Sequence, residues 1–409
     1  MLAAVTMLAA CSTDSENAAP QPADKGTPIT LAAAVEGGDT RSGSAGSIDY
    51  NQLTTTGFGV FASTLGWNNM KVEYNGPTPA ENPGSVFDYP GSWTYGTQKY
   101  WNADASGGPV DFYAYAPYVS AVSETSGITG ISGTNVTYAI ATTPSESVDL
   151  LWGVKGSTGL PWTGTTYANT GGPVLFTFRH ALAAIGFHVQ AMVDQTNDTG
   201  DLGDASDVSG IIGTASSPYK ITIKQVTIGG SFHKSATLNL ANTIKNTPNW
   251  GTPSGTESAL TVGNDNINSD FRHPNTDATT ATTAQTIMTG TMTGITQQAQ
   301  QKLINPATPE QLFFVIPNST QQDYTVTIDW CVSHKTGEST YSAENHTSTI
   351  NVNGLALAAG NRYYINLVFG LKTVNLTVTA DDWVSEPQDV TVKIEHGTSA
   401  SESLAPKQQ

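Results

Sequence analysis

The sequence predicts an all-β protein made of β-sandwich domains. Apolar and polar residues alternate with a period of two in many short segments, which is the pattern of strands with one buried face. Apolar spacing typical of amphipathic helices is nearly absent, and Gly, Pro and Asn separate the segments. Many short strands joined by such turns favour sandwiches over a parallel sheet. The chain is long enough for about two to three domains.

The first ten residues are a short apolar run that we interpret as an export signal. The run is shorter than the roughly 20 residues that span a bilayer, and it suits the central region of a signal peptide. It ends in Leu8-Ala9-Ala10-Cys11, which is similar to a bacterial lipobox, so we expect Cys11 to carry lipid. A plain signal peptide with an incidental cysteine is the alternative. No Lys or Arg precedes Lys25, which is consistent with a start codon further upstream.

A first strand and a possible protease site follow a polar linker. The apolar side chains of residues 28–36 share one face of the predicted strand; they are Ile29, Leu31, Ala33 and Val35. Arg41 and Ser42 come next in Gly- and Ser-rich sequence, where a peptide bond is accessible to a protease. The alternative is that this segment is the first strand of a stable monomer and that Arg41 is an ordinary surface residue.

Further alternating segments predict strands along the rest of the chain. They are residues 58–62, 110–116, 174–178, 185–189, 221–224, 324–332, 374–379 and 390–395. The weakest pattern lies at residues 156–172, which are rich in Gly and Thr. We therefore predict a signal peptide, a propeptide, an N-terminal sandwich and a C-terminal sandwich at residues 1–10, 11–41, 42–172 and 173–409. Residues 194–217 and 245–301 are predicted to be long polar insertions in the last of these.

The charge of the chain excludes nucleic acid as a partner. The formal net charge is −17, and only 12% of the residues are charged. Binding of phosphate groups needs clustered Lys and Arg, which this surface does not offer. The abundance of Thr, Ser, Gly and Asn suits an extracellular β protein.

The sequence contains no familiar signature of an enzyme, and we predict no catalytic residue, cofactor or metal site. Cys331 lies in a strand-like run and is predicted to be a buried structural thiol rather than a nucleophile. His180 lacks a partner motif and is predicted to be a packed or hydrogen-bonded histidine rather than a base. The acidic cluster at residues 194–207 does not match the ligand spacing of an EF-hand, so it is interpreted as a solvated loop.

Aromatic residues in loop-like sequence leave a second functional class open. Exposed rings can stack on sugars, and a monomeric surface lipoprotein that binds glycans would use them; the residues are Trp67, Trp93, Tyr95, Tyr100, Trp101 and Trp162. Packing of these rings at domain edges is the alternative.

Several segments together resemble the fimbrillin family of Bacteroidetes, the pilins and accessory subunits of protease-assembled pili. Thr40-Arg41 lies shortly before the run at 57–62, and the strongest segment is residues 176–187, FTFRHALAAIGF. Residues 110–117, 149–153, 360–367 and 381–383 complete the order. Each segment alone is weak, but their order is fairly specific and spans nearly the whole chain.

This resemblance implies a fold, a location and a mechanism. The family fold is two transthyretin-like β-sandwich domains in tandem, and the subunits are lipoproteins of the outer membrane. An Arg-specific protease cuts after an Arg near the N-terminus, which corresponds to Arg41. The strand that is removed corresponds to residues 29–35, and a terminal strand of a neighbouring subunit fills the groove. The partners implied are other pilin subunits, the protease, the membrane and a host protein or glycan.

The segment 388–396 is our candidate for the donated strand. Val390, Val392 and Ile394 lie on one face of it, as the apolar residues of 29–35 do, so one strand could replace the other. The alternative is that residues 388–396 are a fixed final strand of the C-terminal domain.

Overall fold

The computed structural model describes residues 26–35, 48–76, 93–106, 110–155, 165–167, 173–191, 219–241, 247–273, 295, 301–304, 311–335, 341–370 and 374–382. In these residues the protein is almost entirely β-structure, and its single α-helix is α1 (Tyr50–Thr56). Short 3-10 turns are η1 (Ser63–Leu65), η2 (Pro144–Glu146) and η4 (Asn264–Asn266). The predicted all-β class is confirmed.

The first sheet has eight strands in the order β2-β3-β4-β1-β10-β8-β5-β9. Their bounds are β1 (Leu31–Val35), β2 (Phe58–Ala62), β3 (Trp67–Tyr74), β4 (Trp93–Tyr95), β5 (Val110–Ala116), β8 (Leu151–Lys155), β9 (Thr165–Tyr167) and β10 (Val174–His180). Because β2 also pairs with β5, the sheet closes into a ring that β9 joins from outside. Every pair is antiparallel except β1 with β10, which is parallel.

Two further sheets complete the described chain. One follows the order β18-β17-β12-β7-β6, with β13 and β14 also paired to β12. Its strands are β6 (Gly127–Ser132), β7 (Asn135–Ala139), β12 (Tyr219–Asn239), β13 (Asn249–Trp250), β14 (Ser254–Val262), β17 (Asn318–Lys335) and β18 (Tyr341–Leu357). The other follows the order β15-β11-β19-β20, with β16 also paired to β11. Its strands are β11 (Ala183–Ala191), β15 (Gln301–Lys302), β16 (Phe313–Val315), β19 (Asn361–Phe369) and β20 (Val374–Asp382).

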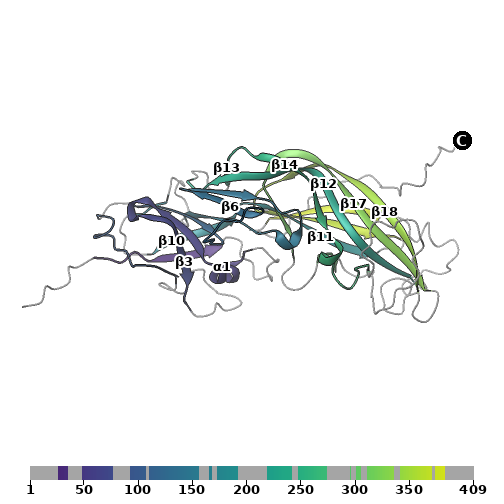
Figure 1. Ribbon diagram of the computed structural model, residues 1–409, viewed down its shortest axis with the longest axis horizontal. Coiled ribbons are helices and arrows are strands. Elements are labelled where there is room, and N and C mark those ends of the chain that lie inside the picture. The colour runs from purple at the N-terminus through teal and green to yellow at the C-terminus, as the bar shows by residue number, and fades with distance from the viewer. Residues whose placement is uncertain are drawn as a thin grey trace, which may run out of the picture.

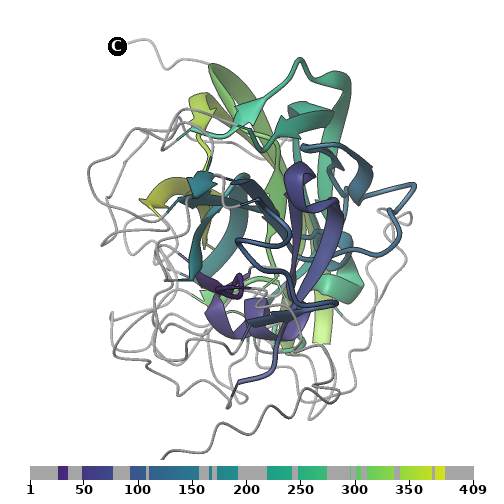
Figure 2. The ribbon, with the colours of Figure 1, turned by 90° about the vertical axis from the view of Figure 1, so that its left-hand side faces the viewer.

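The buried side chains form two hydrophobic cores. The first core lies inside the ring and draws its residues from positions 29–116, 151 and 174–178. The second core lies under the other two sheets and extends from Ile128 to Val378, with Phe61 and Tyr115 added from the first sheet. The molecule is elongated, with β3, β10 and α1 toward one end and β12, β17 and β18 toward the other (Figure 1). Figure 2 looks onto the end where the purple and blue N-terminal strands lie.

The two cores share a wall, because residues that alternate along three strands of the ring point to opposite sides. Within β8, Leu151 belongs to the first core and Trp152 to the second. Likewise β2 and β5 contribute Phe61 and Tyr115 to the second core, while their neighbouring residues line the first. The order of the strands along the chain does not match a division at residue 172. Strands β6 and β7 precede this residue but pair in the sheet with β12, whereas β10 follows it and pairs in the first sheet. The division into tandem sandwiches at residue 172 stays a prediction.

Part of one predicted insertion is ordered structure. Residues 254–262 form β14, which pairs with β12 and buries Leu260 and Val262. Ile267 and Phe271 follow and also enter the second core. The expectation of a polar loop was wrong here. Ser and Thr residues surround the two buried apolar positions of β14, so the sequence of this strand looks like that of a loop. The other predicted insertion, residues 194–217, lies outside the described residues.

Local interactions fix both ends of helix α1. The Asp49 carboxylate accepts a hydrogen bond from the backbone N–H of Gln52 at 2.8 Å, and the Gln52 side chain accepts one from the N–H of Asp49 at 3.2 Å. Such a reciprocal capping box satisfies N–H groups that a helix start leaves open. Gly57 ends the helix at φ 67°, where a side chain would collide with the carbonyl oxygen of Val72. The chain thus turns directly from α1 into β2.

Candidate functional site

Strand β1 is inserted between two strands that lie far from it in the sequence. On one side it runs parallel to β10, with Leu31 opposite Val174 and Val35 opposite Phe178. On the other side Leu31 is opposite Trp93 of β4. All five residues of β1 are buried. The strand therefore completes the ring, and neither of its neighbours in the sheet is next to it along the chain.

One face of β1 and of the residue before it fills the first core. Its side chains are the four that the sequence predicts to share a face, namely Ile29, Leu31, Ala33 and Val35, and this prediction is confirmed. The same core contains a cluster of aromatic rings, in which Phe58 packs edge-on against Phe176 and Phe178 at 5.5 and 5.1 Å between centroids. Residues 29–35 thus provide apolar side chains to the centre of the ring.

The opposite face of β1 carries only small side chains. Ala32 and Ala34 are 9% and 2% exposed, so the outer side of the strand is also covered. A strand buried on both faces leaves little room for larger groups, because protein interiors are densely packed. Strand β1 is thus covered on this face and lined by the first core on the other.

The segment Tyr95–Asp104 holds the chain just before β1, and we call it the latch. The Ile29 carbonyl oxygen accepts hydrogen bonds from the Tyr95 hydroxyl at 2.6 Å and from Gln98 Nε2 at 2.9 Å. The Ile29 N–H donates to the Lys99 carbonyl oxygen at 2.8 Å, and the Trp101 N–H donates to the Thr27 carbonyl oxygen at 2.9 Å. Every one of these bonds ends on a backbone atom of residues 27–29.

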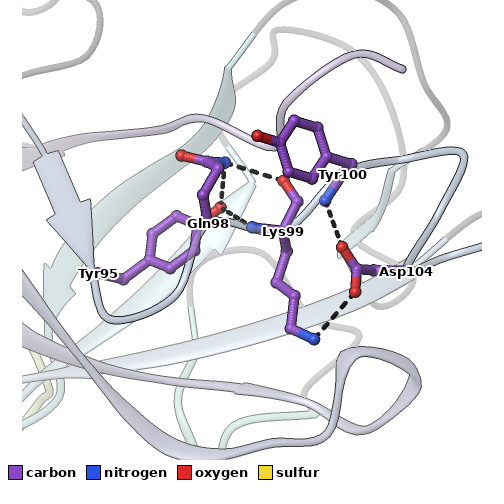
Figure 3. Close-up of polar contacts among 5 residues, drawn as sticks. All are labelled: Tyr95, Gln98, Lys99, Tyr100 and Asp104. Carbon is purple, nitrogen blue, oxygen red and sulfur yellow. Dashed lines mark hydrogen bonds and ion pairs between the residues drawn. The ribbon is translucent and has the colours of Figure 1, made fainter. Parts of the chain in front are cut away.

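Polar contacts within the latch fix its shape (Figure 3). The Asp104 carboxylate accepts from the Tyr100 N–H at 2.8 Å and from Lys99 Nζ at 3.0 Å. Gln98 Nε2 also donates to the Tyr95 hydroxyl oxygen at 2.9 Å. Burial raises the pKa of Tyr95 above its usual value, so the phenol keeps the proton that it donates to Ile29 at neutral pH. The latch is therefore a preformed set of donors and acceptors for an extended backbone.

The residues predicted for lipidation, cleavage and donation lie outside the described residues. They are Cys11, Arg41, Ser42, Val390, Val392 and Ile394. Arg41 falls in the sequence between β1 and Ile48, both of which the structure describes. Their roles stay predictions.

A buried carboxylate fixes the chain where it re-enters the described structure at Ile48. Asp149 accepts hydrogen bonds from the N–H of Ile48 at 3.0 Å and from the N–H of Leu150 at 2.8 Å. Its Oδ2 also lies 2.7 Å from His180 Nδ1. Asp149 is fully buried, and Ile48 and Leu150 belong to different cores. The prediction that His180 is a hydrogen-bonded histidine is confirmed, and the role of Asp149 was missed.

A second polar cluster brings together Cys331 of β17, Asn345 of β18 and His273, which follows η4. Cys331 Sγ lies 4.0 Å from His273 Nε2 and 2.9 Å from Asn345 Oδ1, and His273 Nδ1 lies 3.0 Å from the Thr222 hydroxyl. Burial raises the pKa of the Cys331 thiol to about 11, and burial together with Lys224 lowers the pKa of His273 to about 4.

These pKa shifts bear on what the cluster can do chemically. A reactive cysteine needs a lowered pKa and access to its substrate. Cys331 is fully buried and keeps its proton at neutral pH. The neighbouring His273 is neutral at that pH, so it provides no imidazolium that could lower the pKa of the thiol. The prediction of a buried structural thiol is confirmed.

The aromatic residues considered for glycan binding are mainly core residues. Trp67, Trp93 and Trp101 are all buried in the first core. Tyr95 stacks edge-on against Trp67 at 4.6 Å and belongs to the latch. Of the two alternatives, packing holds for these three, and Gly and Asn flanks had made the short strands and the turn that bury them look like loops. Trp162 lies outside the described residues.

Two further classes of feature are absent from the residues that the structure describes. No three or more His, Cys, Asp and Glu side chains gather there so that they could hold a metal ion. No helix of this part is long and apolar enough to cross a membrane.

Comparison with known proteins identifies relatives by sequence and by fold. The fimbrillin-like family matches residues 49–383, which is most of the chain. No curated protein matches the sequence significantly.

Solved structures provide the comparison of fold. A fimbrial protein from Bacteroides vulgatus ATCC 8482 superposes with a TM-score of 0.52 at 16% identity, over 87% of this chain and 99% of that one. A protein assigned provisionally to cell adhesion from Bacteroides uniformis ATCC 8492 has a TM-score of 0.43 at 14% identity, over 87% and 99% of the two chains. The first of these two similarities supports a shared fold.

Proposed function

This chain belongs to the fimbrillin-like family, and we propose that it is a structural or accessory subunit of a surface fimbria that serves adhesion. In this proposal it is exported as a lipoprotein anchored through Cys11 to the outer membrane. Cleavage after Arg41 then releases β1, and a strand of another subunit takes its place.

The observation that carries the proposal is the position of β1. It is buried on both faces, and it pairs with β10 and β4, neither of which adjoins it in the sequence. The cleavage point after Arg41 separates β1 from every other described strand. One cut would therefore convert a continuous strand into a separate peptide without breaking a hairpin.

Loss of β1 would leave a groove that favours binding of another strand. Loss of the buried side chains of Ile29, Leu31 and Val35 would each remove roughly 1.5–3 kcal/mol of burial free energy. Backbone groups of β10 would also lose their partners, at about 1–3 kcal/mol for each group that stays buried. Addition of a strand from a second subunit relieves both costs. Because such a contact joins two different surfaces, it repeats into a filament.

The buried carboxylate of Asp149 suits the same mechanism. It holds the backbone of Ile48, a few residues after the proposed cleavage point. The new N-terminus at Ser42 would thus stay tethered to the subunit after β1 leaves. Cleavage would open the groove without loosening α1, which begins at Tyr50.

The glycan-binding alternative has lost three of the six aromatic residues that suggested it. Trp67, Trp93 and Trp101 are buried in the first core and offer no exposed ring for stacking on sugars. We therefore retain the fimbrial proposal alone.

Limited proteolysis tests the proposal. The purified full chain is treated with trypsin or with an Arg-specific protease, and the products are examined by N-terminal sequencing and by electrophoresis in SDS. We expect a first cut after Arg41, a stable core, and ladders of SDS-resistant polymers. Arg41→Ala should block both the cut and the ladders while the monomer stays folded.

Two further variants sharpen the outcome. Arg41→Lys should form polymers with trypsin, which also cuts after Lys, but not with the Arg-specific protease. Deletion of residues 388–409 should permit cleavage and prevent ladders. Wild-type ladders from both Arg41→Ala and the deletion variant would refute the mechanism.

A further inference from the structure

We propose that the latch receives the backbone of an incoming strand and sets its register, so that Pro387 of a second copy takes the place of Pro28. This inference rests on the proposed exchange of β1. It adds a binding site for main-chain atoms and a residue-by-residue alignment of the donated strand.

The latch can bind a new strand because it recognises backbone rather than side chains. Tyr95 and Gln98 both donate to the carbonyl oxygen of Ile29, and the other two bonds join backbone groups of both segments. Any extended residue at position 29 presents the same carbonyl oxygen and N–H. The latch thus supplies affinity independent of sequence, as strand addition to a sheet requires.

One position in this segment suits proline. Pro28 faces Tyr100 in an antiparallel bridge, while the flanking residues make the hydrogen bonds. Proline has no N–H, so it is accepted in a sheet only where no ladder bond is needed from it. The fixed φ of proline also favours an extended entry into the strand. Position 28 therefore accepts a proline and provides a marker of register.

The candidate donor carries a proline at the matching distance from its apolar residues. Residues 28–35 read PITLAAAV and residues 387–394 read PQDVTVKI. Alignment of the two prolines places Val390, Val392 and Ile394 at the positions of Leu31, Ala33 and Val35 respectively. The three donor residues then all face the first core, which a shift by one residue would prevent.

The same register puts Gln388 at the position of Ile29, inside the first core. This core contains the indole N–H groups of Trp67 and Trp101, both buried and without a hydrogen-bond partner in the described structure. The backbone N–H of Trp101 donates to the carbonyl oxygen of Thr27, which is two residues before the position that Gln388 would take. The core that receives the Gln388 amide thus holds donors that β1 does not use.

The outer face sets a further condition on the donor. Thr391 and Lys393 would occupy the positions of Ala32 and Ala34, which are tightly covered. In this register the groups that cover Ala34 must move aside, so that the Lys393 stem can carry its ammonium group to water.

Disulfide trapping between subunits tests the register. In β10, Leu175 is the neighbour of Ala32 and Thr177 is the neighbour of Ala34. If Thr391 replaces Ala32, its Cα should lie about 5 Å from that of Leu175 and about 8 Å from that of Thr177. Only the first distance permits a disulfide. The pair Leu175→Cys with Thr391→Cys should crosslink neighbouring subunits, and the matched pair Thr177→Cys with Thr391→Cys should not.

The trapping experiment uses the cleaved full chain carrying Cys11→Ser, with non-reducing SDS electrophoresis after heating. Crosslinking through Thr177→Cys, or through neither pair while ladders form, would overturn the register and leave strand exchange intact. Absence of ladders in the parent chain would instead contradict the proposed function.

The latch itself is tested by Tyr95→Phe, which removes the hydroxyl that donates to Ile29 and accepts from Gln98, and keeps the ring against Trp67. Amide hydrogen exchange of residues 29–35 in the uncleaved chain should become about fivefold faster, the factor expected for one net hydrogen bond. Strand release from cleaved polymers should accelerate by the same factor. Tyr113→Phe removes a hydroxyl elsewhere in the first sheet and should change neither rate.

The two readouts of the latch separate its failure from that of the proposed function. Unchanged exchange in uncleaved Tyr95→Phe would overturn the latch whether or not polymers form. Faster exchange in the uncleaved chain with unchanged release from polymers would show that the latch holds β1 only, and would overturn its role for the incoming strand.

Discussion

The strands around the first and second cores differ in how paired strands are connected along the chain. In the second region, β17 with β18 and β19 with β20 are antiparallel pairs of consecutive strands. This region also contains a parallel pair, β11 with β19, but there β19 keeps β20, the next strand along the chain, as its other neighbour. In the first, β1 lies between β4 and β10, and its pairing with β10 is parallel. Antiparallel neighbours can be joined by a short turn, whereas a parallel pair needs a long crossover.

This difference determines which strand can be exchanged between molecules. A strand in a hairpin stays beside its partner because the turn keeps the two ends together. Strand β1 has no such turn to either neighbour, so a cut in the chain after it makes its binding bimolecular. The first region is therefore suited to exchange, and the second is suited to hold the subunit together meanwhile.

Asp149 joins the two cores, because it accepts hydrogen bonds from the backbone of Ile48 in the first and of Leu150 in the second. Asp149→Ala leaves the N–H groups of Ile48 and Leu150 and the ring nitrogen of His180 without their acceptor. Each buried polar group left without a partner costs about 1–3 kcal/mol, so loss of the acceptor for these three groups should cost at least about 3 kcal/mol. We expect a loss of this size in the free energy of unfolding measured in urea, with both cores affected.

Two variants control for this result. Asp149→Asn keeps the shape and one acceptor oxygen, so it should lose less stability than Asp149→Ala. Glu124→Ala removes an exposed carboxylate and should stay within about 0.5 kcal/mol of the parent. A loss below about 1 kcal/mol for Asp149→Ala would show that the two cores do not depend on this group.

A matched pair of leucines tests whether the two cores respond separately. Leu31 of β1 and Leu238 of β12 are both fully buried, one in each core. Replacement of either by Ala should cost about 2–5 kcal/mol, since it leaves a cavity. In amide hydrogen exchange, Leu31→Ala should weaken protection mainly in β4 and β10. Leu238→Ala should act mainly on β12 and β7, and identical patterns would contradict the separation.

The sequence predicted some of this difference from local patterns. Alternation identified the buried face of residues 29–35, and the strand-like run around Cys331 identified a buried thiol. The parallel pairing of β1 with β10 could not be predicted, because no local pattern specifies which distant strand lies alongside. The same holds for Tyr95 and Gln98, whose shared acceptor is a backbone oxygen far away in the sequence. Asp149 was missed because nothing around it distinguishes a buried carboxylate from an exposed one.

Mild acid should destabilise the second core more than the first. His273 lies against Thr222 of β12 and Cys331 of β17, and both strands belong to a sheet that covers the second core. Burial lowers the pKa of His273 to about 4, compared with about 6.5 in an unfolded chain. Between these two values the unfolded state binds a proton that the folded state does not, so stability falls as the pH decreases. The loss from this group is complete near pH 4.

This acid sensitivity is expected to be the smallest of the three effects, at up to about 3 kcal/mol. The free energy of unfolding, measured in urea from pH 7 to pH 4, should fall less in His273→Gln than in the parent. Burial also lowers the pKa values of His346 and His233, so a shallower decline should persist in that variant. Amide exchange over the same range should accelerate in β12 and β17 before it does in β1 and β10. An unaltered pH profile in His273→Gln would mean that His273 takes up its proton at the same pH in the folded and unfolded states, and the second core would then have no special weakness in acid.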